Sequence, residues 1–543
     1  MSDQTPPGRP ESDDDSWRDR SRRADQRHAH SRRERRRERR RAQRTTATEP
    51  VRRGIALTSV LAVVLLVAGV AAGVAIAPEG SVAPDVPVQP VIEPVGSAEL
   101  VCPEPGTFLG AIVVPGQPGQ DRAGTGSLVP FPGSDQPTLP ITAIGAEVRV
   151  SGTALPPIVV GAQGGFAPGL VADQRNGIQE GPTRGLSSMA CTPAGSSFWF
   201  VGASSLLGRA ARIHLVNPES ASAEVDIEAF GPDGPLPAVA GRGLVIPARS
   251  VDIVKLPLLA PAQRVVAIHV ISRSGRIAAS VDEIDNEGQI ALGSDWLPVA
   301  APPSTVVTIP GIQGNTGSRL LSMLAPGDRD ATVRLRLLTE EGSFVPAGFE
   351  EIDLPAGQVV SLDLSLVLAG RRSAALLTSD QPIVAGIRQV RLGSESSDFS
   401  FSAGTPPLTG PSALVAVPTS TAIRTVITVS SVEGAALDVA AVPVLEDGTA
   451  GTPIPQGSIT VEQGGVTIRD SQVTPLTGLP EGTARATLIL TPQPGSGAYS
   501  VGHTFLTGTP TAPLVTGYPW GPLRVTVSLP QAREDLSVGV PVG

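Results

Sequence analysis

Few residues in this chain could carry acid–base or metal chemistry. Its five histidines are His28, His30, His214, His269 and His503. A catalytic triad or a zinc site needs histidine beside serine, cysteine or carboxylates. The sequence has no H-x-x-x-H, G-x-S-x-G or G-x-x-x-x-G-K-[ST] motif. We interpret the last three histidines as ordinary strand residues, and we expect no enzyme activity, metal or cofactor.

Paired carboxylates are the other signature to consider, because a glycosidase needs two of them across its substrate. Asp282, Glu283 and Asp285 are the candidates, and they lie in a stretch that resembles a turn. We predict that all three are solvated turn charges.

The three tryptophans that follow the uncharged segment 54–77 mark a possible binding surface. Trp199, Trp296 and Trp520 fall in or near the Pro-rich segments that join repeated units of the chain. We favour structural packing for these rings. Grooves at the junctions between units are nevertheless the most promising places for a ligand, since exposed aromatic rings can stack on sugars.

The two cysteines, Cys102 and Cys191, head the similar segments CPEPG and CTPAG. An even number of cysteines in an oxidising compartment favours a disulfide. We predict that they pair.

The candidate residues named above lie in a region of the chain that contains an internal repeat. Shifting the chain by about 108 residues superposes Pro218 on Pro326 and Val225 on Val333, and a more degenerate copy starts near Leu414. Within a copy, AEVDIEAF and ATVRLRLL alternate apolar and polar residues, as in half-buried antiparallel strands. The period is about twice that of a propeller blade, which is the main rival architecture.

We therefore predict an all-β fold of tandem antiparallel β-sandwiches of immunoglobulin-like size, held in a stiff row. The predicted parts are a divergent β unit at 101–195, sandwich repeats at 196–292 and 293–398, a degenerate repeat with a closing strand at 399–530, and a C-terminal tail at 531–543.

The N-terminal part has the charge pattern of a membrane anchor. Residues 1–53 hold 17 arginines against 10 acidic residues, and residues 54–77 are 24 uncharged residues. A helix of 24 residues is about 36 Å long, enough to cross a bilayer. Positive charge stays cytoplasmic, so the rest of the chain is predicted to lie outside. Residues 78–100, rich in proline, are predicted to form a stalk.

Two alternatives concern this N-terminal part. Cleavage after Ala77 is disfavoured, because the apolar run and the segment before it are longer than in a signal peptide. The arginine-rich tail, expected to be disordered, could contact anionic lipid, whereas we do not expect it to bind nucleic acid, because no folded module surrounds it.

A run within 185–202 is formed by Gly185, Leu186, Cys191, Trp199, Phe200 and Gly202. With this run as the most specific part, the layout resembles an uncharacterised family of single-span envelope proteins of high-GC Gram-positive bacteria. The resemblance extends over roughly 50–530. It implies a location in the cell envelope and assigns no catalytic residue.

Two functions follow as hypotheses. The first is a non-enzymatic, membrane-anchored scaffold or binding protein outside the cell, since rigidly joined repeats create long surfaces. The alternative is a protein that binds or acts on cell-wall glycan through grooves at the unit junctions.

Overall fold

The computed structural model describes residues 91–529, apart from 153–154, 315–316 and 446–448. The predicted tail (1–53), membrane helix (54–77) and C-terminal tail (531–543) lie outside the described residues. No helix in the part of the chain that is described is long and apolar enough to cross a membrane. The described residues belong to one compact unit.

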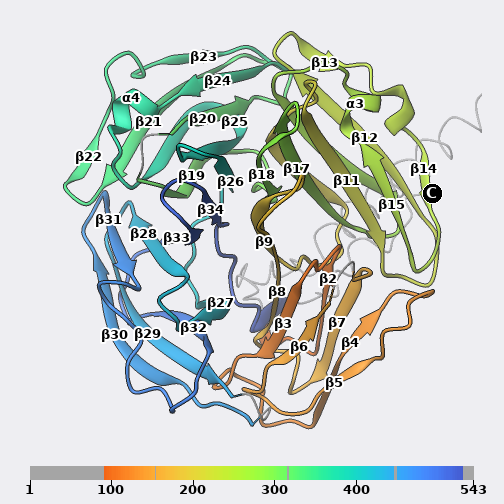
Figure 1. The fold of residues 1–543 in the computed structure, drawn as a ribbon, viewed down its shortest axis with the longest axis vertical. Helices are drawn as coiled ribbons and strands as arrows, with labels where there is room; N and C mark the ends of the chain where they lie inside the picture. The colour runs from red at the N-terminus through yellow and green to blue at the C-terminus, as the bar shows by residue number, and fades with distance from the viewer. Residues whose placement is uncertain (1–90, 153–154, 315–316, 446–448, 530–543) are drawn as a thin grey trace, which may run out of the picture. The chain divides into compact units, whose positions relative to one another are not determined.

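Strands dominate this unit, and the prediction of an all-β fold of antiparallel sheets is confirmed. The helices of the described residues are three single turns: η1 (Val239–Gly241), α3 (Leu256–Leu259) and α4 (Ser365–Leu368). The strands form four two-layered sandwiches (Figure 1).

Sandwich 1 pairs one sheet of order β2-β7-β4-β5 with another of order β6-β3-β8-β9. Its strands are β2 (Ser97–Cys102), β3 (Phe108–Val113), β4 (Gly124–Pro130), β5 (Leu139–Ile141), β6 (Val148–Ser151), β7 (Ile158–Gly164), β8 (Leu170–Ile178) and β9 (Gly185–Ala190). The disulfide Cys102–Cys191 is present, with a Cα–Cα distance of 4.6 Å, and joins the end of β2 to the residue after β9.

Sandwich 2 has the same strand order, β10-β16-β12-β13 and β15-β11-β17-β18, with β14 also pairing with β12. Its strands are β10 (Ser197–Ala203), β11 (Arg209–Asn217), β12 (Ala223–Gly231), β13 (Gly234–Leu236), β14 (Leu244–Ile246), β15 (Ser250–Lys255), β16 (Val266–Ser274), β17 (Ala278–Glu287) and β18 (Ile290–Leu297).

In sandwich 3 the long strand β25 serves both sheets. Its first half pairs with β19 and β21, and its second half pairs with β20 and β26. The strands are β19 (Ser304–Ile312), β20 (Arg319–Leu324), β21 (Ala331–Thr339), β22 (Gly342–Phe344), β23 (Ile352–Leu354), β24 (Val359–Asp363), β25 (Ser373–Leu392) and β26 (Ser397–Ala403).

Sandwich 4 repeats the order of sandwich 1, with sheets β27-β32-β29-β30 and β31-β28-β33-β34. Its strands are β27 (Ser412–Pro418), β28 (Arg424–Ser431), β29 (Ala435–Val444), β30 (Ile454–Val461), β31 (Gly465–Asp470), β32 (Arg485–Pro492), β33 (Ser500–Gly508) and β34 (Pro513–Thr516).

The limits of two predicted units need correction. Strand β18 pairs with β17 and β26 pairs with β25. Sandwich 2 therefore runs to Leu297 and sandwich 3 to Ala403, whereas the predicted boundaries after 292 and 398 cut these strands. The physical reason is that the last strand of each sandwich closes a hairpin with the strand before it, so it stays with the preceding sheet.

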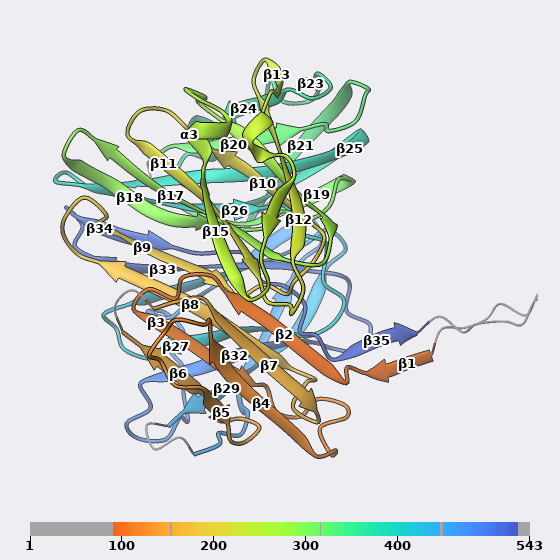
Figure 2. The same cartoon turned by 90° about the vertical axis from the view of Figure 1, so that its right-hand side faces the viewer.

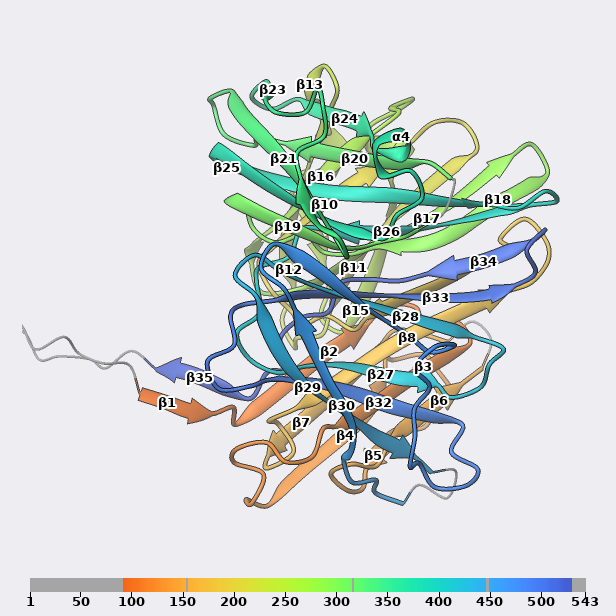
Figure 3. The ribbon, with the colours of Figure 1, turned by 90° about the vertical axis from the view of Figure 1, so that its left-hand side faces the viewer.

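The last part of the predicted stalk is also folded. Strand β1 (Val91–Pro94) pairs antiparallel with β35 (Thr526–Leu529), so the first and last described strands lie side by side (Figures 2 and 3). β2 starts at Ser97 and belongs to sandwich 1. Proline at position 94 is tolerated because it ends an edge strand.

The sandwiches contact one another in a closed cycle and not in an open row. Each junction places the first sheet of one sandwich on the second sheet of the next. An apolar cluster fills each of the four junctions. Val101 and Val159 of sandwich 1 lie against Val216 and Ala278 of sandwich 2, and Trp199 and Ala267 of sandwich 2 lie against Leu324 and Val384 of sandwich 3. Leu338 and Leu376 of sandwich 3 lie against Val466 of sandwich 4, and Val442 and Ile489 of sandwich 4 lie against Ile112 and Val114 of sandwich 1. The contact between sandwiches 4 and 1 could not be read from a linear repeat.

Candidate functional site

A groove opens at the junction of sandwiches 2 and 3. Its volume is about 440 Å³, within the usual range for small-molecule sites. One wall is the outer face of the β10–β16–β12 sheet, and the other is formed by the 325–329 turn and the Gln381–Pro382 segment of sandwich 3. We call it the 2–3 groove.

The sheet wall of this groove is a row of cross-strand partners. Trp199 on β10 lies opposite His269 on β16, and His269 lies opposite Glu228 on β12. Opposite residues of antiparallel strands share a face. The rings of Trp199 and His269 stack with their centroids 3.9 Å apart. The indole face is thus covered by an imidazole and is not presented to a sugar.

Hydrogen bonds hold this imidazole in place. Its Nε2 is 2.9 Å from the Ser197 hydroxyl, and its Nδ1 is 3.4 Å from a carboxylate oxygen of Glu228. Burial lowers the pKa of His269, and the Glu228 carboxylate opposes this change. The groove also has Asp328 and Arg329 on its opposite wall. It therefore offers an imidazole, two carboxylates, a guanidinium and proline surfaces to a ligand.

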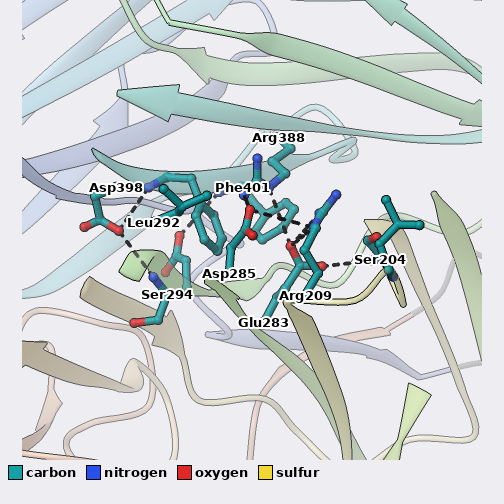
Figure 4. A network of polar contacts seen from close by, with 12 residues as sticks. Ser204, Arg209, Glu283, Asp285, Leu292, Ser294, Arg388, Asp398 and Phe401 are labelled. Carbon is teal, nitrogen blue, oxygen red and sulfur yellow. Dashed lines mark hydrogen bonds and ion pairs between the residues drawn. The ribbon is translucent and has the colours of Figure 1, made fainter. Parts of the chain in front are cut away.

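The same junction contains a buried ionic network (Figure 4). Glu283 accepts hydrogen bonds from Arg209 Nε at 3.0 Å and from the Ser204 backbone N–H at 2.9 Å. Arg388 comes from sandwich 3, lies 3.5 Å from Glu283, bonds to Asp285, and places its guanidinium over the Phe399 ring. Two guanidinium groups thus balance two carboxylates.

This placement corrects a prediction made from the sequence. Asp282, Glu283 and Asp285 lie on β17 and are buried, with Glu283 fully so. They are not solvated turn charges. The arginines that neutralise them are distant in sequence, which is why the stretch resembled a polar turn.

Four strands meet where the sandwiches converge: β9, β18, β26 and β34. We call them the central strand cluster. Asp398 on β26 accepts backbone hydrogen bonds from Leu186 of sandwich 1 (3.0 Å), Val515 of sandwich 4 (2.8 Å) and Ser294 of sandwich 2 (3.3 Å). One carboxyl group therefore connects all four sandwiches.

Asp295 on β18 makes the matching set of contacts. It accepts hydrogen bonds from the Ser188 N–H (3.2 Å), the Thr516 hydroxyl (2.8 Å) and the Phe401 N–H (3.3 Å). Burial raises the pKa of Asp398 to about 8 and the pKa of Asp295 well above its usual value, while the hydrogen bonds oppose both changes.

Gly185 shows why a glycine heads the run quoted above. A Cβ at this position would overlap the backbone nitrogen and the side chain of Ser294 on β18. The close approach of β9 to β18 therefore requires the absence of a side chain.

A second buried polar group lies between sandwiches 1 and 4. Glu147 is almost fully buried, and neither of its carboxylate oxygens has a hydrogen-bond partner among the described residues. Asp173 accepts a hydrogen bond from the Tyr518 hydroxyl at 3.2 Å. Burial raises the pKa of Glu147 to about 7 and that of Asp173 to about 6.

Glu147 makes stability depend on pH in a defined direction. Its pKa in the folded protein is above the unfolded value of 4.5, because burial favours the protonated carboxyl group. The contribution of this group to the free energy of unfolding is therefore fully present below pH 4.5 and is lost as pH rises through about 7. The free energy of unfolding of Glu147→Gln minus that of wild type is expected to rise by on the order of 3 kcal/mol when the pH is changed from 4.5 to 8. Urea unfolding at both pH values measures this, with the exposed Glu99→Gln as control. An unchanged difference would contradict the prediction.

The remaining candidates from the sequence are on strands. His214 on β11 is buried beside Asp282 at 2.9 Å, and its ring lies 5.0 Å from that of Trp296 on β18. His503 on β33 accepts a hydrogen bond from the Trp520 indole at 3.1 Å. Trp199, Trp296 and Trp520 are all buried, and of these Trp199 lines the 2–3 groove. No group of three or more metal-ligating side chains occurs within residues 91–529 as described.

Comparisons with known proteins place the chain in a family. A family model described as "Family of unknown function (DUF5719)" matches residues 142–468. The chain belongs to this family. The part that matches DUF5719 contains all of sandwiches 2 and 3, and therefore the 2–3 groove and its ionic network.

The other comparisons add little to the DUF5719 assignment. No curated protein matches the chain. A solved structure titled "Crystal Structure of Thermotoga maritima 1070" is 16% identical with a TM-score of 0.17, and the match covers 19% of this chain and 94% of that chain.

The buried carboxyl groups that connect the four sandwiches were missed in the sequence analysis. Asp295 and Asp398 each follow a serine on the last strand of a sandwich, in GSDW and SSDF. That shared Ser-Asp pair was the available signal. Glu147 and Asp173 had none, since their surroundings come from sandwich 4.

Proposed function

We propose that this protein is a non-enzymatic binding or scaffold protein of the cell envelope, anchored in the membrane by residues 54–77 with the sandwiches outside the cell. The observation that carries the proposal is the central strand cluster. Two carboxyl groups there bond to strands of all four sandwiches. Such bonding favours one fixed arrangement, which is what a platform for partners requires.

The 2–3 groove is the proposed binding surface. It lies between two sandwiches that the ionic network holds together, so its walls are fixed relative to each other. Its proline surfaces and exposed Asp328 and Arg329 suit a protein segment that offers both apolar and charged side chains. The expected partner is therefore another envelope protein.

Crosslinking in cells tests this proposal. A photoreactive residue at Arg329, on the groove wall, is expected to capture a specific partner from the envelope. The same residue at Arg242, which is exposed but does not line the groove, is the matched control. Capture at 329 should disappear when Pro382→Arg fills the groove. Equal capture at both sites, or none at 329, would contradict the proposal.

The alternative is binding or cleavage of cell-wall glycan in the same groove. Its volume and its two carboxylates, Glu228 and Asp328, favour this alternative, while the covered Trp199 ring opposes it. Purified full-length protein that retains or hydrolyses wall glycan, with loss of this activity in Glu228→Gln, would support the alternative over the scaffold.

The anchor is tested separately. Protease added to intact protoplasts is expected to remove the sandwiches and to spare the arginine-rich tail, which is proposed to lie in the cytoplasm and to contact anionic lipid. Digestion of the tail alone would reverse the proposed topology.

A further inference from the structure

Arginines gather at one end of the junction between sandwiches 3 and 4. Arg372 immediately precedes β25, and Arg391 is near the end of the same strand. Ser373 pairs with Ile312 at the end of β19, and Gln389 pairs with Arg319 at the start of β20, so the two ends of β25 lie at the same end of sandwich 3. Arg424, at the start of β28, comes from sandwich 4. We call Arg372, Arg391 and Arg424 the arginine cluster.

A single carboxylate is shared by two members of the cluster. Asp470, at the end of β31, has both oxygens 3.0 Å from Arg424 Nε, and one of them 3.5 Å from an Arg372 terminal nitrogen. The Asp470 side chain is 7% exposed, whereas those of Arg372 and Arg424 are 28% and 32% exposed. The carboxylate is thus saturated, and both guanidinium groups keep donors that reach solvent.

Arg391 has no such carboxylate. Its side chain is half-buried, and within the described part of the chain it has no hydrogen bond or ion pair to an acceptor side chain. Gly314 lies against the Arg372 side chain, and Gly317, three residues on, lies against the backbone of Val390 and Arg391. Burial lowers the pKa of Arg391, and the charges of Arg424 and Arg372 lower it further. The cluster therefore has three positive charges and one negative charge.

A local excess of positive charge is unexpected in this part of the protein. Residues 78–543 have 25 basic and 41 acidic residues. Like charges held together in a half-buried place raise the energy of the folded state unless an opposite charge joins them. Guanidinium groups bind phosphate and related oxyanions through paired N–H donors.

We propose that the arginine cluster binds an oxyanion, a phosphate or phosphodiester group, between Arg391 and the free donors of Arg372 and Arg424. The anion neutralises the excess charge and links sandwich 3 to sandwich 4. Asp470 orients two of the three guanidinium groups and leaves their remaining donors for the ligand. This site is distinct from the 2–3 groove and does not depend on the function proposed for it.

Inorganic phosphate is the first probe. Full-length protein is titrated with phosphate at constant ionic strength, and binding is followed by calorimetry and by the rise in unfolding temperature. Wild type is expected to bind one phosphate, and Arg391→Gln to bind at least tenfold more weakly. Arg391→Lys keeps the charge but loses the paired donors, and should fall between them. Arg276→Gln, an exposed arginine paired with Glu219, is the matched control.

The source of the phosphate is tested with a phosphodiester. Glycerophosphoglycerol, a soluble fragment typical of envelope polymers and lipid headgroups, is compared with inorganic phosphate. Tighter binding of the diester, lost in Arg391→Gln, would identify an envelope polymer or headgroup as the source, and tighter binding of phosphate would identify the free anion. If neither compound binds wild type better than chloride does, or if Arg391→Gln binds as wild type does, the proposal is wrong.

Discussion

Replacing Asp398 by alanine is expected to lower the free energy of unfolding by about 4 kcal/mol. The carboxyl group accepts backbone hydrogen bonds from three other sandwiches, and alanine would leave these N–H groups without that acceptor. Each buried donor left without an acceptor costs about 1–3 kcal/mol. Asp398→Asn is expected to lose nearly as much, because its amide group would point N–H donors at backbone N–H donors.

Urea unfolding of the full-length protein measures this loss, and hydrogen exchange locates it. Peptides containing Leu186, Ser294 and Val515 are expected to exchange faster in Asp398→Ala, while those in the sandwich cores stay protected. Asp252→Ala, at an exposed position of β15, is the control. If Asp398→Ala unfolds like the control, the carboxyl group does not hold the sandwiches together.

Replacing Glu283 by alanine is expected to cost about 3–5 kcal/mol. The side chain is fully buried and lies against both Arg209 and Arg388. Without it, two buried guanidinium groups would share the single carboxylate of Asp285. Uncompensated buried charge is more costly than the loss of the ion pair itself.

A double variant separates these two costs. In Glu283→Leu with Arg388→Met, Arg209 retains Asp285, and the network is again balanced. The double variant is expected to be more stable than Glu283→Ala, although it has lost more polar contacts. Thermal and urea unfolding of wild type and both variants test this expectation. A double variant less stable than the single one would show that the individual contacts matter more than the charge balance.

The alternation of apolar and polar residues in AEVDIEAF and ATVRLRLL was enough to predict that these segments are strands and which side chains face the core. Ala223, Val225 and Ile227 do lie in the core of sandwich 2. The pairing of Cys102 with Cys191 also followed from the sequence, because only two cysteines are present. These features depend on local periodicity and on counting, which a linear sequence displays directly.

The closed cycle of sandwiches was decided by tertiary structure. Ile112 and Val114 read as ordinary strand residues, and only the folded chain shows that they pack against Val442 and Ile489. The same holds for Glu283, whose polar neighbours in sequence suggested a solvated turn. Its burial depends on Arg388, which comes from another sandwich. Burial and charge pairing between distant strands depend on three-dimensional proximity, and residue type and local spacing do not encode that proximity.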